Sequence, residues 1–205
     1  GFIQRRVSVG SIADFLRFKD PRMSKEFLKP ADSKISLGEA GVAGCARVEY
    51  LEVWLRELVD HKVPLSTICI MSEPVHFTEE WRCWFDGDSV VEHAKYRIGG
   101  LFDSSYTETW DTSWPFEYGE QVLGFAEEAG ALLSMPCVID VGYSHEYGLE
   151  VIETNPVWSS GLYTVRYDKI YEALKASFEF SLAGKGREWE PDAWLQSRER
   201  LSLVR

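Results

Sequence analysis

Several features are missing from this sequence, and each absence excludes a common class of protein. There is no apolar run of the roughly eighteen residues that a membrane-spanning helix needs. The first residues, GFIQRRVSVG, lack the apolar stretch and cleavage site of a signal peptide. We therefore expect no membrane association and no export, and a location in the cytoplasm.

Basic residues are in the minority, with 22 Lys and Arg against 33 Asp and Glu and a formal net charge of −11. Phosphate contacts with nucleic acid are made by clusters of Lys and Arg, and no such cluster dominates this acidic chain. A nucleic-acid partner is therefore not expected. The chemistry is better sought among the acidic side chains.

Common metal and nucleotide motifs are also absent. The four cysteines and four histidines show neither a CxxC pair nor ligand spacing, which argues against zinc, redox dithiol and histidine-based metal sites. The chain has no GxxxxGKS and no GxGxxG at the start of a helix, which excludes a P-loop and a dinucleotide fingerprint. We expect buried, reduced thiols at Cys45, Cys69, Cys83 and Cys137.

What is present suffices for a mixed α and β core, because 45% of the 205 residues are apolar and 14% are aromatic. Apolar periodicity and turn residues predict helices after Ser11 and over 49–61, 115–133 and 168–182. They predict strands over 26–30, 66–75, 79–85, 89–98, 137–143 and 149–155, with loops or a flap over 31–48 and 100–114.

The last two strands, CVIDVGY and LEVIETN, form a predicted hairpin that brings oxygen ligands together. Pairing them about Glu146 and Tyr147 places Asp140 opposite Glu153, and Asn155 shares their face because side chains two apart point the same way. Two opposed carboxylates repel unless a cation lies between them, and Mg²⁺ favours such oxygen ligands. The alternative is that these side chains lie on a solvated outer face of the sheet and bind no metal.

The preceding hairpin, EEWRCWF and SVVEHAKYRI, is predicted to separate a core face from a charged face. A turn at Gly87 and Asp88 opposes Arg82 to His93 and Glu80 to Lys95. The charged face then carries Glu80, Arg82, His93, Lys95 and Arg97, and the core face includes Ala94 and Tyr96. Arg82 and Arg97 are candidates for stabilising phosphoryl transfer, since arginine bridges phosphate oxygens bidentately. The alternative is a solvated hairpin face in which Glu80 pairs with Lys95.

Two lysines add possible phosphate contacts. Lys29 ends an apolar strand just before Pro30, and Lys34 begins the glycine-bearing segment. Lone lysines are more often solvent-exposed side chains than ligands.

Together these segments, from EFLKPADSK through IMSEPV, EEWRCWF and YRI to VIDVG and VIETNP, resemble the ATP-grasp superfamily over about 150 residues. The SSGLY run after VIETNPV resembles a compact bacterial and phage branch. The resemblance implies that Asp140, Glu153 and Asn155 bind Mg²⁺, that Lys29 and Lys34 contact ATP phosphates, and that Arg82 and Arg97 face phosphate or substrate. It also implies that the backbone around Met71 meets adenine and that Glu73 binds ribose.

The implied fold class is α+β, with two α/β lobes whose antiparallel sheets clasp the nucleotide. We expect a smaller lobe over 1–72, a larger lobe with the metal hairpin over 73–183 and a peripheral charged tail over 184–205, the usual extra N-terminal domain being absent or reduced.

The implied activity is an ATP- and Mg²⁺-dependent carboxylate–amine ligase, with a small-molecule or peptide carboxylate and an amine acceptor as substrates. The alternatives are a phosphotransferase on the same fold and a non-catalytic nucleotide- or partner-binding module.

Overall fold

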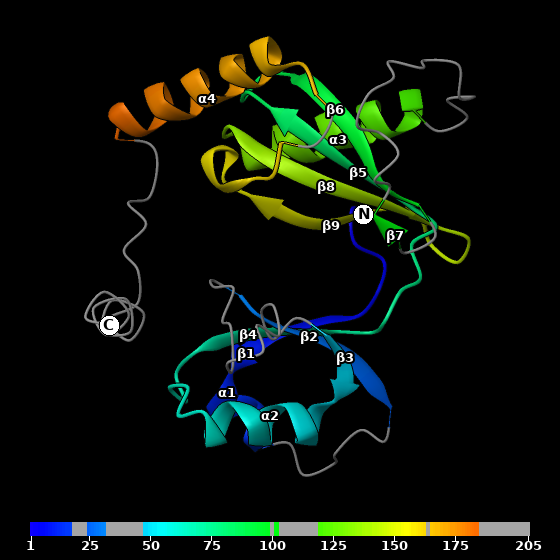
Figure 1. The fold of residues 1–205 in the computed structure, drawn as a ribbon, viewed down its shortest axis with the longest axis vertical. Helices are drawn as coiled ribbons and strands as arrows, with labels where there is room; N and C mark the ends of the chain where they lie inside the picture. Colours follow the sequence, from blue (N-terminus) through cyan, green and yellow to red (C-terminus); the bar gives the residue numbers. More distant parts are fainter. Residues whose placement is uncertain (18–23, 32–46, 99–100, 103–118, 163–164, 185–205) are drawn as a thin grey trace. The chain divides into compact units, whose positions relative to one another are not determined.

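The computed structural model describes residues 1–17, 24–31, 47–98, 101–102, 119–162 and 165–184. These fall into two compact units. The N-terminal unit comprises described residues of Arg5–Val75, and the C-terminal unit those of His76–Trp189 together with Gly1–Gln4. Each unit has its own antiparallel sheet and core, which confirms the α+β class expected from the sequence (Figure 1).

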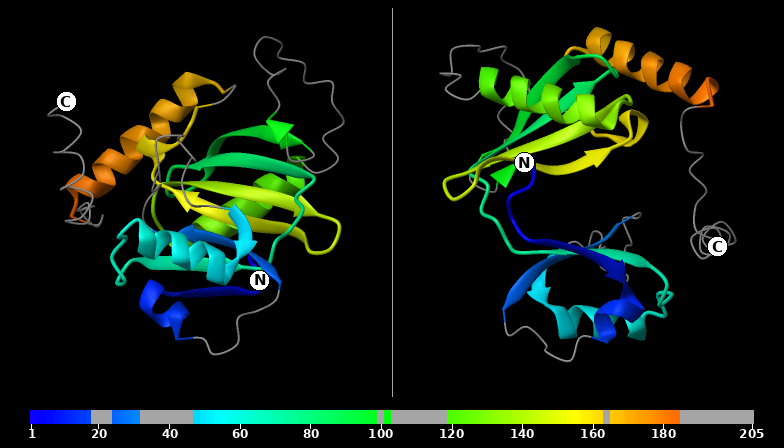
Figure 2. Two further views of the ribbon diagram at one scale, coloured as in Figure 1. Left: turned by 60° about the horizontal axis from the view of Figure 1, so that its bottom comes forward. Right: turned by 180° about the vertical axis from the view of Figure 1, so that it is seen from behind.

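The N-terminal unit is a four-stranded sheet in the order β1-β4-β2-β3, with both helices on one face (Figures 1 and 2). Its elements in chain order are β1 (Val7–Ser11), α1 (Ile12–Leu16), β2 (Lys25–Pro30), β3 (Arg47–Tyr50), α2 (Leu51–Asp60) and β4 (Ile68–Ser72). The strands β1 and β3 are not among those expected from the sequence.

Helix α1 begins at the expected N-cap, where the Ser11 Oγ accepts from the Asp14 N–H and the Asp14 carboxylate accepts from the Ser11 N–H. The apolar stripe predicted for α2 is confirmed, since Leu51, Trp54, Leu55 and Leu58 are buried against the sheet with Leu28 and Met71.

The C-terminal unit is a five-stranded sheet in the order β7-β6-β5-β8-β9. Its elements are β5 (Glu79–Phe85), β6 (Val90–Ile98), β7 (Leu101–Phe102), α3 (Gly119–Leu133), β8 (Cys137–Ser144), β9 (Gly148–Asn155), the 3-10 turn η2 (Val157–Ser159) and α4 (Tyr167–Leu182). Of the loop expected over 100–114, Leu101–Phe102 form the strand β7 instead, and the rest lies outside the described residues, as do the Pro115 helix start and residues 32–46.

Strand β5 lies in the middle of this sheet and is buried on both faces. Trp81, Cys83 and Phe85 pack with α3, whereas Trp84 packs on the opposite face with Ala94, Val138 and α4. The two helices therefore cover opposite faces, as the rear view in Figure 2 shows. Toward the other end of the strands, the α4 face carries charged side chains.

The chain's first residues complete the edge of this sheet. The Phe2 carbonyl accepts a hydrogen bond from the Val151 N–H at 2.8 Å, and the Phe2 ring meets the Phe125 ring edge-on with centroids 5.1 Å apart. The Gln4 N–H donates to the buried Glu150 carboxylate. Residues 1–4 thus pack against β9 and α3, although they precede the N-terminal unit in sequence.

The expected register of the β5–β6 hairpin is wrong beyond its turn. The turn itself is as expected, with the Asp86 N–H donating to the Ser89 carbonyl. A bulge between Trp84 and Phe85 then shifts the pairing by one residue, and a second bulge follows between Glu80 and Trp81. Arg82 consequently lies opposite Ala94 rather than His93, and Glu80 opposite Arg97 rather than Lys95.

This shift also exchanges residues between the two faces, because a one-residue slip reverses every side chain. His93 and Lys95, expected on the charged face, pair with Cys83 and Trp81 on the α3 side. Ala94 and Tyr96, expected on the face of Trp81, lie instead on the face of Arg82, where Ala94 is buried in the core cluster of Trp84.

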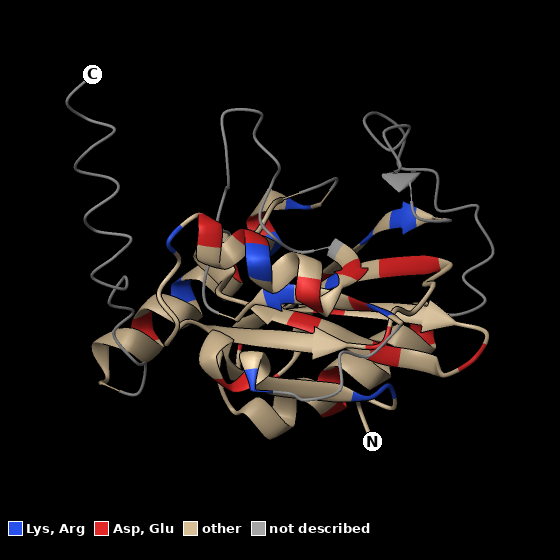
Figure 3. Ribbon diagram, turned by 90° about the horizontal axis from the view of Figure 1, so that it is seen from below, with Lys and Arg blue, Asp and Glu red and all other residues tan. Residues whose placement is uncertain are grey.

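Among the helices that the structure describes, none is long and apolar enough to cross a membrane. Figure 3 shows Lys and Arg interspersed with Asp and Glu along the described helices and strands.

Candidate functional site

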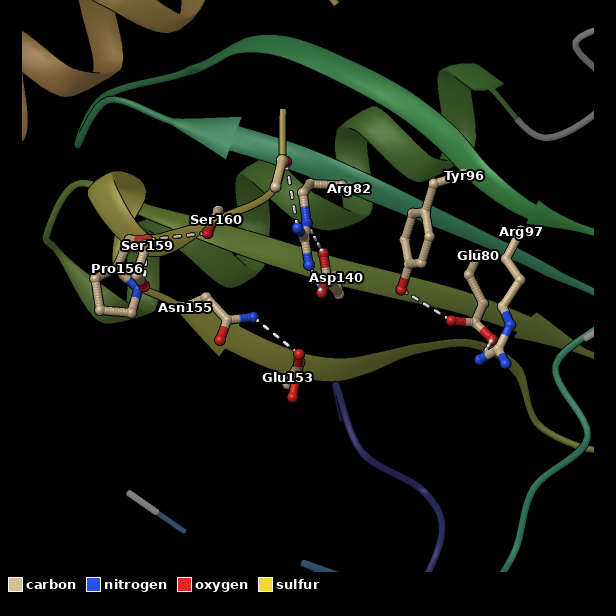
Figure 4. Close-up of polar contacts among 11 residues, drawn as sticks. Glu80, Arg82, Tyr96, Arg97, Asp140, Glu153, Asn155, Pro156, Ser159 and Ser160 are labelled. Carbon is tan, nitrogen blue, oxygen red and sulfur yellow. Dashed lines mark hydrogen bonds and ion pairs between the residues drawn. The ribbon is translucent and has the colours of Figure 1, made fainter. Parts of the chain in front are cut away.

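Three oxygen-bearing side chains meet on the α4 face of the β8–β9 hairpin, in the arrangement expected from the sequence. Asp140 pairs with Glu153 and Val138 with Asn155. Asn155 lies beside Glu153, and its Nδ2 donates to the Glu153 Oε1 at 3.0 Å (Figure 4). Asp140 is buried, whereas Glu153 and Asn155 are half-buried.

A β-bulge brings Asp140 and Glu153 opposite each other. Near the turn the pairs are Ser144 with Gly148 and Val141 with Val151, and the register shifts by one residue between Asp140 and Val141. Without that shift Asp140 would face Ile152, and Glu153 would point to the other side of the sheet.

Asp140 is held by Arg82 from the neighbouring strand β5. The Arg82 Nε donates to Asp140 Oδ1 at 2.8 Å and Nη2 donates to Oδ2 at 2.6 Å, a bidentate pair whose side chains are 9% and 1% exposed. Arg82 Nη1 donates to the Gly161 carbonyl at 3.3 Å. The segment after β9 is therefore tied to the same guanidinium.

The environment of Asp140 acts on its protonation in opposite directions. Burial raises the pKa of Asp140, and the nearby Glu153 and Glu80 carboxylates raise it further. The hydrogen bonds and positive charge of Arg82 lower it. The net pKa shift is upward, because the effect of burial outweighs that of Arg82.

A second charged cluster lies farther along the same face, around Glu80. Glu80 is buried, and its Oε2 accepts from the Tyr96 hydroxyl at 2.8 Å while its Oε1 accepts from Arg97 Nη1 at 3.2 Å. The Tyr96 ring also lies under the Arg82 guanidinium, 5.5 Å from its centroid. Figure 4 shows this cluster beside the Arg82–Asp140 pair.

The second β-bulge explains why two consecutive residues reach one carboxylate. Trp81 pairs with Lys95 and Glu80 with Arg97, which leaves Tyr96 as the extra residue. Tyr96 and Arg97 can then both turn toward Glu80. Burial raises the pKa of the Tyr96 phenol strongly, and the Asp140 and Glu80 charges add to this, so Tyr96 remains a hydrogen-bond donor.

The nucleotide-binding residues expected from the N-terminal unit are placed on β2 and at the end of β4. Lys29 lies opposite Ile70, on the sheet face away from Leu28 and the helices. The Met71 side chain is buried in the core, so only its backbone is suited to a ligand. The Glu73 carboxylate accepts the Arg6 N–H at 3.2 Å. Lys34 lies outside the described residues.

The donor set fits a magnesium ion in chemistry, since two carboxylates and an amide offer the hard oxygens it prefers. No group of three His, Cys, Asp or Glu is placed to hold a metal within the described parts of the chain. The candidate site therefore consists of Asp140, Glu153 and the neutral Asn155, with Arg82 beside it.

Asp140, Glu153 and Asn155 are predictable from the sequence as one group, whereas the contacts across β5 are not. Each hairpin can be aligned by itself, but the pairing of Arg82 with Asp140 joins strands β5 and β8 of two different hairpins. One signal was available: EEWRCWF has large apolar residues on both faces, which is typical of a central strand with two neighbours. No spacing in the sequence indicates the bond from Arg82 to Gly161.

The fold and this site together define an ATP-grasp domain. The chain belongs to the ATP-grasp domain family, as a member of family 3 of one of its clades, and the model of that family matches residues 7–174. A comparison with curated protein sequences found no match to this chain.

Two solved structures illustrate the similarity of the fold. The D-alanine–D-alanine ligase from Coxiella burnetii is 14% identical with a TM-score of 0.50, and the match covers 100% of this chain and 58% of that one. The D-alanine–D-alanine ligase from Bacillus anthracis, complexed with ATP, is 12% identical with a TM-score of 0.50, and the match covers 88% and 61%. This chain therefore spans less than two thirds of either ligase.

Proposed function

We propose that this chain is the nucleotide- and metal-binding part of an ATP-dependent ligase, which activates a carboxylate as an acyl phosphate for attack by an amine. The observation that carries the proposal is the convergence of Asp140, Glu153 and Asn155 on one sheet face beside two arginines. Membership of the ATP-grasp family supports ATP as the cosubstrate.

Asp140, Glu153 and Asn155 would hold Mg²⁺, which when bound neutralises phosphate charge and orients the γ-phosphoryl group. Lys29 and Lys34 would contact ATP phosphates as point charges. The backbone at Met71 would meet adenine, and Glu73 would bind the ribose. These last contacts rest on the resemblance of the residues to the family.

The chemistry would proceed in two displacements. A carboxylate oxygen of the substrate forms a bond to the γ-phosphorus of ATP, and the bond from that phosphorus to the bridging oxygen breaks, releasing ADP. The amine nitrogen then bonds to the acyl carbon, the carbon–oxygen bond to phosphate breaks, and the nitrogen loses a proton. The protein positions the reactants and offsets charge.

Arg82 and Arg97 would stabilise the charge that develops on the transferring phosphoryl group. Both lie on the α4 face of the sheet, and the Arg97 side chain is 37% exposed. Both arginines form ion pairs in this structure, Arg82 with Asp140 and Arg97 with Glu80. Each guanidinium is therefore already oriented by a carboxylate.

Calorimetry with ATP and Mg²⁺ tests the proposed nucleotide site. The double variant Asp140→Asn, Glu153→Gln should bind MgATP at least about tenfold more weakly, or about 1.4 kcal/mol, and lose the magnesium dependence of binding. Both substitutions keep side-chain size but remove the negative charge and turn one acceptor oxygen into an NH2 donor, so Asp140→Asn also loses one of the two bonds from Arg82. Glu146→Gln, in the exposed turn of the same hairpin, is the matched control and should leave binding unchanged.

Wild-type affinity and magnesium dependence in the double variant would place the metal elsewhere. Product analysis separates the reaction classes. ADP, phosphate and a joined product indicate a ligase, a phosphorylated acceptor indicates a phosphotransferase, and binding without turnover of any acceptor indicates a nucleotide-binding module.

A further inference from the structure

Arg82 already occupies both oxygens of Asp140, a residue of the proposed metal site. Both Asp140 oxygens receive hydrogen bonds from one guanidinium, at 2.8 and 2.6 Å, inside the protein. A carboxylate held in this way is already neutralised. Each oxygen keeps a further lone pair for a cation, but that cation would have to share the carboxylate with the guanidinium.

A cation between Asp140 and Glu153 would also lie close to the positive charge of Arg82. Like charges a few ångströms apart repel, and the repulsion is strong where side chains are buried. Arg82 and the metal are thus competitors for the same carboxylate. Because Asp140 is only 1% exposed, its charge needs one of the two as a partner.

Arg82 has contacts that survive the loss of Asp140. Its Nη1 is bonded to the Gly161 carbonyl at 3.3 Å, and its guanidinium lies 5.5 Å from the centroid of the Tyr96 ring. Tyr96 is itself held by Glu80. A guanidinium released from Asp140 would stay on this face of the sheet, with the Nε and Nη2 donors available to another anion.

We propose that Arg82 is the internal counterion of Asp140 in the metal-free protein and that Asp140 exchanges it for the metal of MgATP. The inference rests on the proposed function. The Nε and Nη2 donors released from Asp140 then bind the phosphate oxygens. Arg82 is therefore available to ATP only when the metal is bound. Arg82 would also favour metal that arrives with nucleotide over metal alone.

Metal binding without nucleotide distinguishes this role from that of a simple phosphate ligand. In the full chain, Arg82→Gln should bind Mn²⁺, followed by the spin-resonance signal of the free ion, roughly tenfold more tightly than wild type, because a nearby positive charge is removed. The same variant should bind ATP more weakly. Arg166→Gln, which removes an exposed arginine paired with Asp168 instead, should leave Mn²⁺ affinity unchanged.

Equal or weaker Mn²⁺ binding by Arg82→Gln than by wild type would overturn the exchange while leaving the metal site intact. If neither protein binds Mn²⁺ and the Asp140→Asn, Glu153→Gln variant binds MgATP normally, the proposed function fails as well.

A second measurement covers the case in which Arg82→Gln does not fold. In wild type, the Arg82 Nε–H signal in a nitrogen–proton correlation spectrum, assigned by its loss in Arg82→Lys, should shift when Mg²⁺ and a non-hydrolysable ATP analogue saturate the protein. An Nε–H signal unmoved at saturation would show that Arg82 keeps Asp140, and the proposal would be wrong.

Discussion

His93 is the residue whose environment gives the clearest pH dependence. It lies on the α3 side of β6, half-buried opposite Cys83, and burial lowers its pKa below 6.5, while the Glu92 charge opposes this. The unfolded chain therefore binds the proton more readily than the folded one. Stability from neutral His93 is complete above the unfolded pKa and is lost as pH falls from 6.5 through the lowered folded value.

Urea unfolding at several pH values checks this expectation. The free energy of unfolding should decline from pH 7.5 to 5.5, and His93→Gln should reduce that decline. His145→Gln, in the exposed turn between β8 and β9, is the control and should keep the wild-type slope. An unaltered slope in His93→Gln would assign the acid sensitivity to other groups.

Single residues were predicted best where their partners lie close in sequence. Asp140 and Glu153 are joined by one short hairpin, and counting about Glu146 and Tyr147 placed them opposite each other. The pairs nearer the turn are one residue out of that expected register, and the bulge beside Asp140 restores it. The buried, free state of Cys69, Cys83 and Cys137 was also expected, whereas Cys45 lies outside the described residues. Arg82 meets Asp140 across 58 residues of sequence, and hairpin counting carries no information about that distance.

Helix α3 contains two glycines whose replacement should have opposite effects. A Cβ at Gly130 would lie 2.7 Å from the Phe85 ring, whereas a Cβ at Gly124 would meet nothing within 4 Å. Alanine is the better helix former by up to about 1 kcal/mol, so Gly124→Ala should stabilise the protein by roughly that amount. Gly130→Ala should destabilise it by about 1–3 kcal/mol, because overpacking outweighs helix propensity.

Thermal and urea unfolding of the two variants measure this difference directly. Adding Phe85→Leu to Gly130→Ala should recover part of the loss relative to Phe85→Leu alone, since the smaller side chain makes room. A stabilised Gly130→Ala protein would show that α3 can move away from the sheet at little cost.

At the level of elements, the types of secondary structure were easier to predict than their registers. The helices α1, α2, α3 and α4 and the strands β2, β4, β5, β6, β8 and β9 all follow from apolar periodicity and turn residues. The three β-bulges do not, because nothing in VVEHAKYRI or GLEVIETN marks where an extra residue leaves the ladder. Each bulge changes which side chains face α4, so the charged face could be predicted only in part.

For the whole molecule, the family resemblance assigns ATP contacts to residues of the N-terminal unit as well, and Lys29 tests that assignment. Lys29→Ala should weaken ATP binding by about tenfold while the melting temperature stays close to wild type, since the side chain is only half-buried. Lys25→Ala, on the same strand and over the Tyr50 ring, is the matched control. A large fall in melting temperature with unchanged ATP affinity would make Lys29 a structural residue.

The discontinuity of the C-terminal unit has a consequence for the order in which the chain folds during synthesis. Gln4 bonds to Glu150, 146 residues later, whereas the described strands of the N-terminal unit all lie within Arg5–Val75. At 5–20 residues per second, residues 1–4 emerge from the ribosome about 7 to 30 seconds before their partners on β9 exist. The N-terminal unit can form in that interval, while the aromatic ring of Phe2 still lacks its partner Phe125 on α3. The β9 edge of the five-stranded sheet is therefore completed last, by residues that are synthesised before any of its strands.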